Sequence, residues 1–231
     1  NAAGAGITSV NASGDAADMA SHKAVDAILK YLFKIDGVCR TKIVFCAEVG
    51  PTKKEIYVCD FDGRNFKKLT NNNTLSVEPV WSPNGKSVVY SFYGRSYTDL
   101  VELDLTTNRS RHLTQFPGLN AGGRISPDGS RVALVLSKDN QVDLYTRSVN
   151  GTDLRRLTKD KSVEASPCWS PDGSKICYVS DGGNAGRPSL YVMPASGGSA
   201  TRLQTVGSEA VSPSWSKRSE ERRVGKECRS R

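Results

Sequence analysis

A short motif that recurs four times constrains this chain most. It starts with Trp or Ile followed by Ser, and its first three copies continue with Pro, then Asn or Asp, then Gly. The serines of the four copies lie 44, 44 and 46 residues apart, at Ser82, Ser126, Ser170 and Ser216. A second marker, Leu followed by Thr in three copies and by Gln in the fourth, precedes each motif by 12 residues. Two markers in constant phase indicate one supersecondary unit that is repeated along the chain.

Each period contains four short runs that are typical of β-strands. In the period around Trp81, runs at 87–92, 99–105 and 109–114 follow a shorter run before the Trp, and turn residues separate them. Helical repeats of this length need longer amphipathic segments with fewer β-branched residues. Four antiparallel strands per period form the blade of a β-propeller. The Pro-Asp-Gly triplets suit tight turns, and we expect the recurring Trp to fill the space between neighbouring blades.

The repeat divides the chain into several unequal parts. We expect a partial blade at 41–70, full repeats over 74–204 and a lone inner strand at 210–216, all within a propeller domain spanning 41–216. The predicted fold class is mainly β, an incomplete propeller of antiparallel four-stranded blades. Such an arc cannot close into a ring, so its last inner strand is expected to be an unprotected edge that favours association.

The N-terminal residues 1–40 have a different pattern. Apolar side chains recur at helical spacing, which predicts an amphipathic helix at about 20–34 that ends before Gly37. One such helix cannot bury its apolar stripe alone. We therefore expect residues 1–40 to be the C-terminal remnant of another domain.

The last residues, 217–231, break the period in the middle of a blade. They carry seven basic and three acidic residues, so they supply half of the formal net charge of +8. We expect this segment to be non-native sequence, with a natural disordered basic tail as the alternative. The remaining charge forms no basic stripe interleaved with aromatic residues, so nucleic-acid binding is not expected. No apolar run approaches the ~18 residues of a membrane span, and no direct membrane insertion is expected.

Six cysteines occur, none of them in a Cys-x-x-Cys pair, so neither a zinc site nor a redox motif is indicated. Two pairs flank predicted turns, Cys46 with Cys59 and Cys168 with Cys177, and both are placed for cross-strand contact. Each pair is either a disulfide in an oxidising compartment or two buried free thiols.

The sequence contains no pattern that indicates a catalytic site. There is no Gly-x-Ser-x-Gly elbow, and neither His22 nor His112 stands near a nucleophile. We therefore predict no catalytic residue, no cofactor and no metal, and a protein that is not an enzyme.

A binding role follows from the architecture, because a propeller gathers loops from every blade around one axis. Glu78, Asn120 and Glu164 lie just before predicted inner strands, where they could grip a partner. The alternative is that these residues cap the strand or hydrogen-bond the next blade.

The blade motif, as in Pro167–Gly173 followed by an apolar strand and Gly197-Gly198, resembles the propeller repeat of the TolB family. The junction at 35–48 and the loop at 180–188 are similar to that family too, and the resemblance covers about residues 15–216. It implies that residues 1–40 are the remnant of a small α/β domain and that the chain holds about four of six propeller blades.

This resemblance implies a periplasmic, non-enzymatic protein of the Tol-Pal system, which serves envelope integrity and cell division. In that family a six-bladed propeller binds the peptidoglycan-associated lipoprotein Pal at one mouth, and an N-terminal segment that is outside this chain engages TolA. The Pal-facing loops correspond to 74–78, 119–123 and 163–166. The candidate partner-binding residues are therefore Glu78, Leu119, Asn120, Gly122, Glu164 and Ala165. The stretch at 122–124 departs from the family, which more often has Pro there.

Two other functions remain open from the sequence. Peptidase propellers share the blade motif, so the alternative function is the substrate-gating propeller of a prolyl-oligopeptidase-like serine peptidase. A small-ligand or lectin-like propeller is the third option. The helix and junction at 18–48 favour the TolB-like function.

Overall fold

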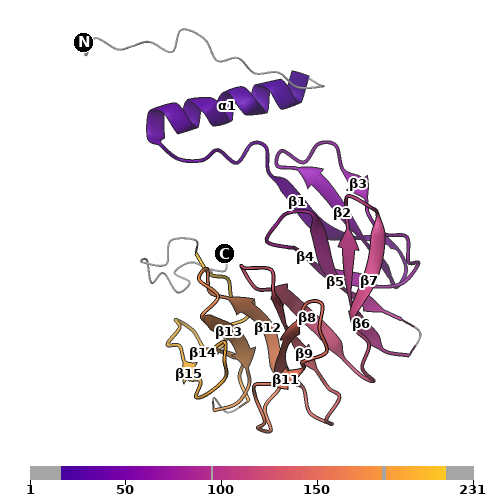
Figure 1. Ribbon diagram of the computed structural model, residues 1–231, viewed down its shortest axis with the longest axis vertical. Helices are drawn as coiled ribbons and strands as arrows, with labels where there is room; N and C mark the ends of the chain where they lie inside the picture. Colours follow the sequence, from indigo (N-terminus) through magenta and orange to yellow (C-terminus); the bar gives the residue numbers. More distant parts are fainter. Residues whose placement is uncertain (1–16, 95, 184–185, 217–231) are drawn as a thin grey trace.

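The computed structural model describes residues 17–94, 96–183 and 186–216. These residues form one helix and four antiparallel sheets that fan out in an arc, with each sheet contributed by one consecutive stretch of chain (Figure 1). Within each sheet the strands follow chain order, so every connection is a simple antiparallel turn. The prediction of a mainly β, incomplete propeller with antiparallel blades is confirmed.

The first two sheets follow the helix. The first holds three strands: β1 (Lys42–Gly50), β2 (Lys53–Asp60) and β3 (Lys67–Lys68). The second holds four strands: β4 (Ser76–Trp81), β5 (Ser87–Tyr93), β6 (Thr98–Asp104) and β7 (Arg109–Thr114).

The last two sheets repeat the second one. The third holds β8 (Asn120–Ile125), β9 (Arg131–Leu136), β10 (Asp143–Ser148) and β11 (Arg155–Arg156). The fourth holds β12 (Glu164–Trp169), β13 (Lys175–Ser180), β14 (Ser189–Pro194) and β15 (Thr201–Arg202). In these three sheets the first strand, β4, β8 or β12, is the inner strand of its blade.

The structure forms no strand at 210–216, so the prediction of a lone inner strand there is wrong. An inner strand is held by hydrogen bonds to the second strand of its own blade. The corresponding second strand would follow residue 216, outside the part of the chain that the structure describes. Trp215 nevertheless occupies the Trp position of the repeat, since its indole Nε1 donates to the carbonyl of Cys168 at 3.3 Å.

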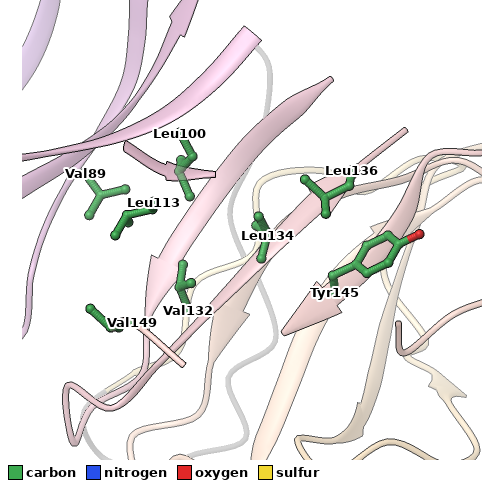
Figure 2. Packing of buried hydrophobic residues seen from close by; sticks show 8 residues of the cluster. All are labelled: Val89, Leu100, Leu113, Val132, Leu134, Leu136, Tyr145 and Val149. Carbon is green, nitrogen blue, oxygen red and sulfur yellow. The ribbon is translucent and has the colours of Figure 1, made fainter. Parts of the chain in front are cut away.

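The core lies between the blades as well as within them. In the largest cluster, side chains from β5, β6 and β7 meet side chains from the third sheet (Figure 2). The fully buried members include Val89 and Leu100 on one side and Leu134 and Leu136 on the other. Burial of each such side chain contributes about 1.5–3 kcal/mol, so neighbouring blades stabilise one another through apolar contact.

The turns between first and second strands explain the recurring motif. In the third blade, Ser126 donates to Asp128 at 2.5 Å and accepts from the N–H of Arg131, and Gly129 has a φ of 76° that only Gly adopts easily. The Ser126 and Ser130 hydroxyls lower the pKa of Asp128 to about 2. The Asp is therefore part of the turn.

Helix α1 (Ala17–Phe33) is the element expected at about 20–34. Several contacts tie it to the following chain: His22 Nε2 lies 3.2 Å from Asp62, and buried Asp26 accepts from the N–H of Cys39 and from Arg40. Part of its apolar face stays exposed, including Leu32 and Phe33. Residues 1–16 lie outside the described chain, so the assignment of residues 1–40 to an α/β remnant stays a prediction. The expected non-native tail at 217–231 also lies outside the described residues.

Candidate functional site

The loops of each blade divide between two faces of the arc. Connections that enter an inner strand, and those between second and third strands, lie on the face that we call the entry face. The turns between first and second strands, and between third and fourth strands, lie on the opposite face. This division follows from the antiparallel order of the strands.

A shallow hollow of about 250 Å³ opens on the entry face between the second and third blades. Its lining consists of Tyr93, Gly94, Ser96, Tyr97, Thr98, Gly118 and Leu119. Tyr93 and Tyr97 are 39% and 51% exposed, so they offer amphipathic surface of the kind that protein interfaces favour. Sequence reasoning missed both tyrosines, although their position in the turn between two predicted strands could have indicated them.

Leu119 belongs to this hollow, and its neighbour Asn120 holds the loop in shape. Asn120 is completely buried. Its side chain accepts from the N–H of Phe116 at 3.1 Å and donates to the carbonyls of Phe116 and Gly118. The N–H of Leu119 donates to the Ser137 hydroxyl at 2.8 Å. Asn120 thus closes the 116–120 loop on itself and presents Leu119 at the surface.

Glu164 is the counterpart of Asn120 in the next blade and is equally hidden, with 1% exposure. It accepts from the hydroxyls of Ser180 and Thr158, each at 3.2 Å. Burial, followed by the nearby charge of Asp160, raises the pKa of Glu164 to about 7. Both Asn120 and Glu164 therefore hydrogen-bond within the protein and offer no surface to a partner.

The other candidate residues are more accessible or shape the backbone. Glu78 is exposed, has a positive φ of 55°, and accepts from the Ser91 hydroxyl at 3.2 Å. Ala165 is half-buried at the start of β12. Gly122 is buried with a φ of 68°, and a Cβ there would lie 3.2 Å from Pro167 of the next inner strand.

A buried network links the Leu-Thr marker to acidic residues, which sequence reasoning did not find. The Thr158 hydroxyl accepts from the N–H of Leu144 at 2.9 Å and lies 3.2 Å from both Asp143 and Glu164. In the first sheet Thr70 repeats this, accepting from Ile56 N–H and donating to Glu55 at 2.5 Å.

The acidic partners recur with the repeat, at Glu55, Asp99 and Asp143, each 44 residues apart. That period was the signal in the sequence that could have revealed the network. The second blade differs, because Asp99 lies 3.2 Å from His112 and the buried Thr114 hydroxyl has no partner among the described residues.

A larger groove of about 690 Å³ lies on the opposite face, between the third and fourth blades. Its acidic members Asp128 and Asp172 are held by serine hydroxyls of their own turns, which lower the pKa of each to about 2. Arg131 is paired with Asp153 at 2.9 Å. Four charged residues of this groove are thus engaged within the protein, and exposed Arg155 also lines it.

The cysteine pairs behave differently from one another. Cys168 and Cys177 stand directly opposite on β12 and β13, and both are free thiols. The expected cross-strand contact of Cys46 with Cys59 is wrong, since Cys46 faces Ile56 and Cys59 faces Ile43. The turn at Gly50–Lys53 sets a register that offsets the two thiols by three residues.

The described ranges contain neither a metal-binding cluster nor a membrane-spanning helix. No group of three or more His, Cys, Asp or Glu side chains gathers there as a metal-ion site. The helix in these ranges is not both long and apolar enough to span a membrane.

Comparison with known proteins identifies the fold and its relatives. The model of the TolB beta propeller domain family matches residues 29–224. The Tol-Pal system protein TolB of Paramagnetospirillum magneticum is 36% identical over 102 residues, which are 43% of this chain and 23% of that protein. The crystal structure of TolB from Acinetobacter baumannii superposes with a TM-score of 0.76 and 26% identity, covering 83% of this chain and 48% of that one.

The chain spans about a quarter or less of the length of the curated relatives that it matches, and 48% of the Acinetobacter baumannii TolB. A Mycobacterium tuberculosis puromycin-hydrolysing peptidase superposes with a TM-score of 0.52 at 16% identity, and this likeness shows the fold alone.

Proposed function

This chain belongs to the TolB β-propeller domain family, and we propose that it is the propeller part of a protein-docking scaffold in a Tol-Pal envelope system. Its relatives carry the name Tol-Pal system protein TolB. We propose a periplasmic location and a role in envelope integrity and cell division. The function is binding rather than catalysis, and the proposed partners are Pal at the propeller mouth and TolA through a segment outside this chain.

The observation that carries this proposal is the hollow on the entry face. Exposed Tyr93 and Tyr97 and half-buried Leu119 surround it. Aromatic anchors in a rigid hollow are the usual centre of a protein interface, because they bury large area at small entropic cost. Asn120 holds the Leu119 loop by three hydrogen bonds, so the surface is preorganised.

The roles that we propose for the candidate residues follow from how deeply each one is buried. Glu78, Leu119 and Ala165 are the proposed contact residues. Asn120, Gly122 and Glu164 are proposed as positioning residues, since they are buried and act on the backbone of the loops.

The test is binding of purified Pal to the complete protein that contains this chain. Tyr97→Ala and Leu119→Ala are expected to weaken binding by about 10-fold or more each, as loss of an interface anchor does. Arg155→Ala is the matched control, because Arg155 is exposed beside the groove on the opposite face. Unchanged affinity in the first two variants, or an equal loss in the control, contradicts the proposed docking face.

The substrate-gating function of a peptidase propeller makes a different prediction. It requires a hydrolase domain with a Gly-x-Ser-x-Gly elbow in the same polypeptide. A complete gene that encodes such a domain would replace the scaffold proposal.

A further inference from the structure

Two thiols face each other across the innermost pair of strands in the fourth blade. Cys168 on β12 and Cys177 on β13 are direct partners in the antiparallel register. Directly opposed residues of an antiparallel pair have Cα atoms about 4.5–5.5 Å apart. Disulfides join Cα atoms that are about 4.4–6.8 Å apart. The backbone is therefore already placed for a disulfide without any change of register.

The two thiols differ in access and in acidity. Cys177 is buried, whereas Cys168 is half-buried. The hydrogen bond from Cys177, together with the nearby charge of Arg124, lowers the pKa of Cys168. The same hydrogen bond and burial raise the pKa of Cys177. The more accessible thiol is thus also the one that ionises first.

We propose that Cys168 and Cys177 form an oxidation site that accepts a disulfide from small-molecule or protein disulfides, with Cys168 as the attacking thiol. The Cys168 thiolate attacks one sulfur of the donor, and the other donor sulfur leaves as a thiolate. Cys177 then loses its proton and attacks Cys168 Sγ, which releases the second donor thiolate. The pair loses two electrons and two protons, and the donor disulfide is reduced to two thiols.

The Cys168–Cys177 disulfide would lie beside a locally irregular part of β12, the inner strand of the fourth blade. The β12–β13 register shifts between Ala165 and Cys168, Ser166 has a φ of 48°, and Pro167 has no N–H to donate. On its other side, the carbonyl of Cys168 accepts from the Trp215 indole at 3.3 Å. A link at Cys168 therefore secures β12 immediately after its bulge.

The chain carries its own control pair on the first sheet. Cys46 faces Ile56, and Cys59 faces Ile43, so each cysteine is three residues from the position opposite the other. At about 3.4 Å per residue this offset separates the thiols by about 10 Å along the strands. These two cysteines cannot be bridged while the sheet keeps its register.

The experiment exposes the folded full chain to oxidised glutathione, alkylates the remaining thiols and maps the peptides by mass spectrometry. The expected product is an internal 168–177 disulfide that dithiothreitol reverses, with Cys46 and Cys59 still alkylated. Cys177→Ser is expected to stop at a glutathione adduct on Cys168. Cys168→Ser is expected to leave Cys177 unmodified.

Three results would overturn the proposal. One is full alkylation of both Cys168 and Cys177 after prolonged exposure of the folded chain. Another is oxidation of Cys46 and Cys59 to the same extent, which would show unspecific reactivity. The third is a glutathione adduct on Cys177 rather than on Cys168 in the single variants. Circular dichroism of each variant verifies that the β-sheet is retained before the thiols are compared.

Discussion

The indole Nε1 of Trp169 donates a 2.8 Å hydrogen bond to the backbone carbonyl of Arg124, on the inner strand of the preceding blade. Trp215 makes the same kind of bond to the carbonyl of Cys168. The recurring Trp therefore fills space, as the sequence predicts, and also joins successive inner strands by a polar bond. Ile125 has no side-chain N–H at the equivalent position, so it cannot donate to the preceding inner strand; at that junction Arg147 donates to the carbonyl of Leu113 instead.

Trp169→Phe is expected to destabilise the protein by about 1–3 kcal/mol, because it leaves the Arg124 carbonyl without its donor. Trp81→Phe is the matched control, since among the described residues the Trp81 indole has no hydrogen-bond partner, while the loss of ring area is the same. Urea unfolding of both variants measures the difference. Equal losses of stability would mean that the hydrogen bond across the blades contributes nothing.

Thr158→Val is expected to cost about 1–3 kcal/mol, because the Leu144 N–H loses its acceptor and two carboxylates lose a donor. Thr114→Val changes the same position of the preceding repeat, where the hydroxyl is buried without a partner. That change is expected to be neutral or slightly stabilising. Thermal unfolding of the two variants distinguishes them, and a reversed order would refute the assigned network.

Stability is expected to depend on pH through Glu164. Its pKa in the folded state is raised to about 7 from 4.5, mainly by burial and then by Asp160. The folded state thus binds this proton more tightly than the unfolded state does. Glu164 therefore adds about 3 kcal/mol to the free energy of unfolding below about pH 4.5, and this stabilisation is lost as the pH rises through about 7. Glu164→Gln should flatten the unfolding free energy between pH 5 and 8, and an unchanged pH profile would exclude Glu164 as its source.

Gly123→Ala is expected to destabilise the protein by about 1–3 kcal/mol, because a Cβ there would lie 2.4 Å from the side chain of buried Leu100. The clash crosses from β8 to β6 of the preceding blade. Gly50→Ala is the control, since no heavy atom lies within 4 Å of a Cβ at that position. Denaturant midpoints compare the two, and a similar midpoint for both would show that Leu100 yields at little cost.

The contact with Leu100 also explains a feature that the sequence left open. The neighbouring inner strands carry Pro79 and Pro167 where β8 has Gly123. The structure places Leu100 of the preceding blade against that position, so no side chain fits there. The departure from the TolB pattern at 122–124 is thus a packing adjustment between the second and third blades.

The sequence period was enough to predict the fold, because each blade repeats the same local contacts. The 44-residue spacing, the Ser-Pro-Asp-Gly turns and the Trp position follow from contacts within one repeat or between adjacent repeats, and these recur in the sequence. The inner strand expected at 210–216 is not formed, and no strand of the described residues pairs with that segment.

The sequence by itself determined the number of strands per repeat, the turn chemistry and the family. The tertiary structure alone decided which polar residues face inward, since Asn120 and Glu164 look like loop residues but are buried at the blade junctions. It also decided that Cys168 meets Cys177 while Cys46 misses Cys59. The physical reason is register: turn length and bulges set which residues stand opposite, and a shift of one residue changes every pairing on the strand.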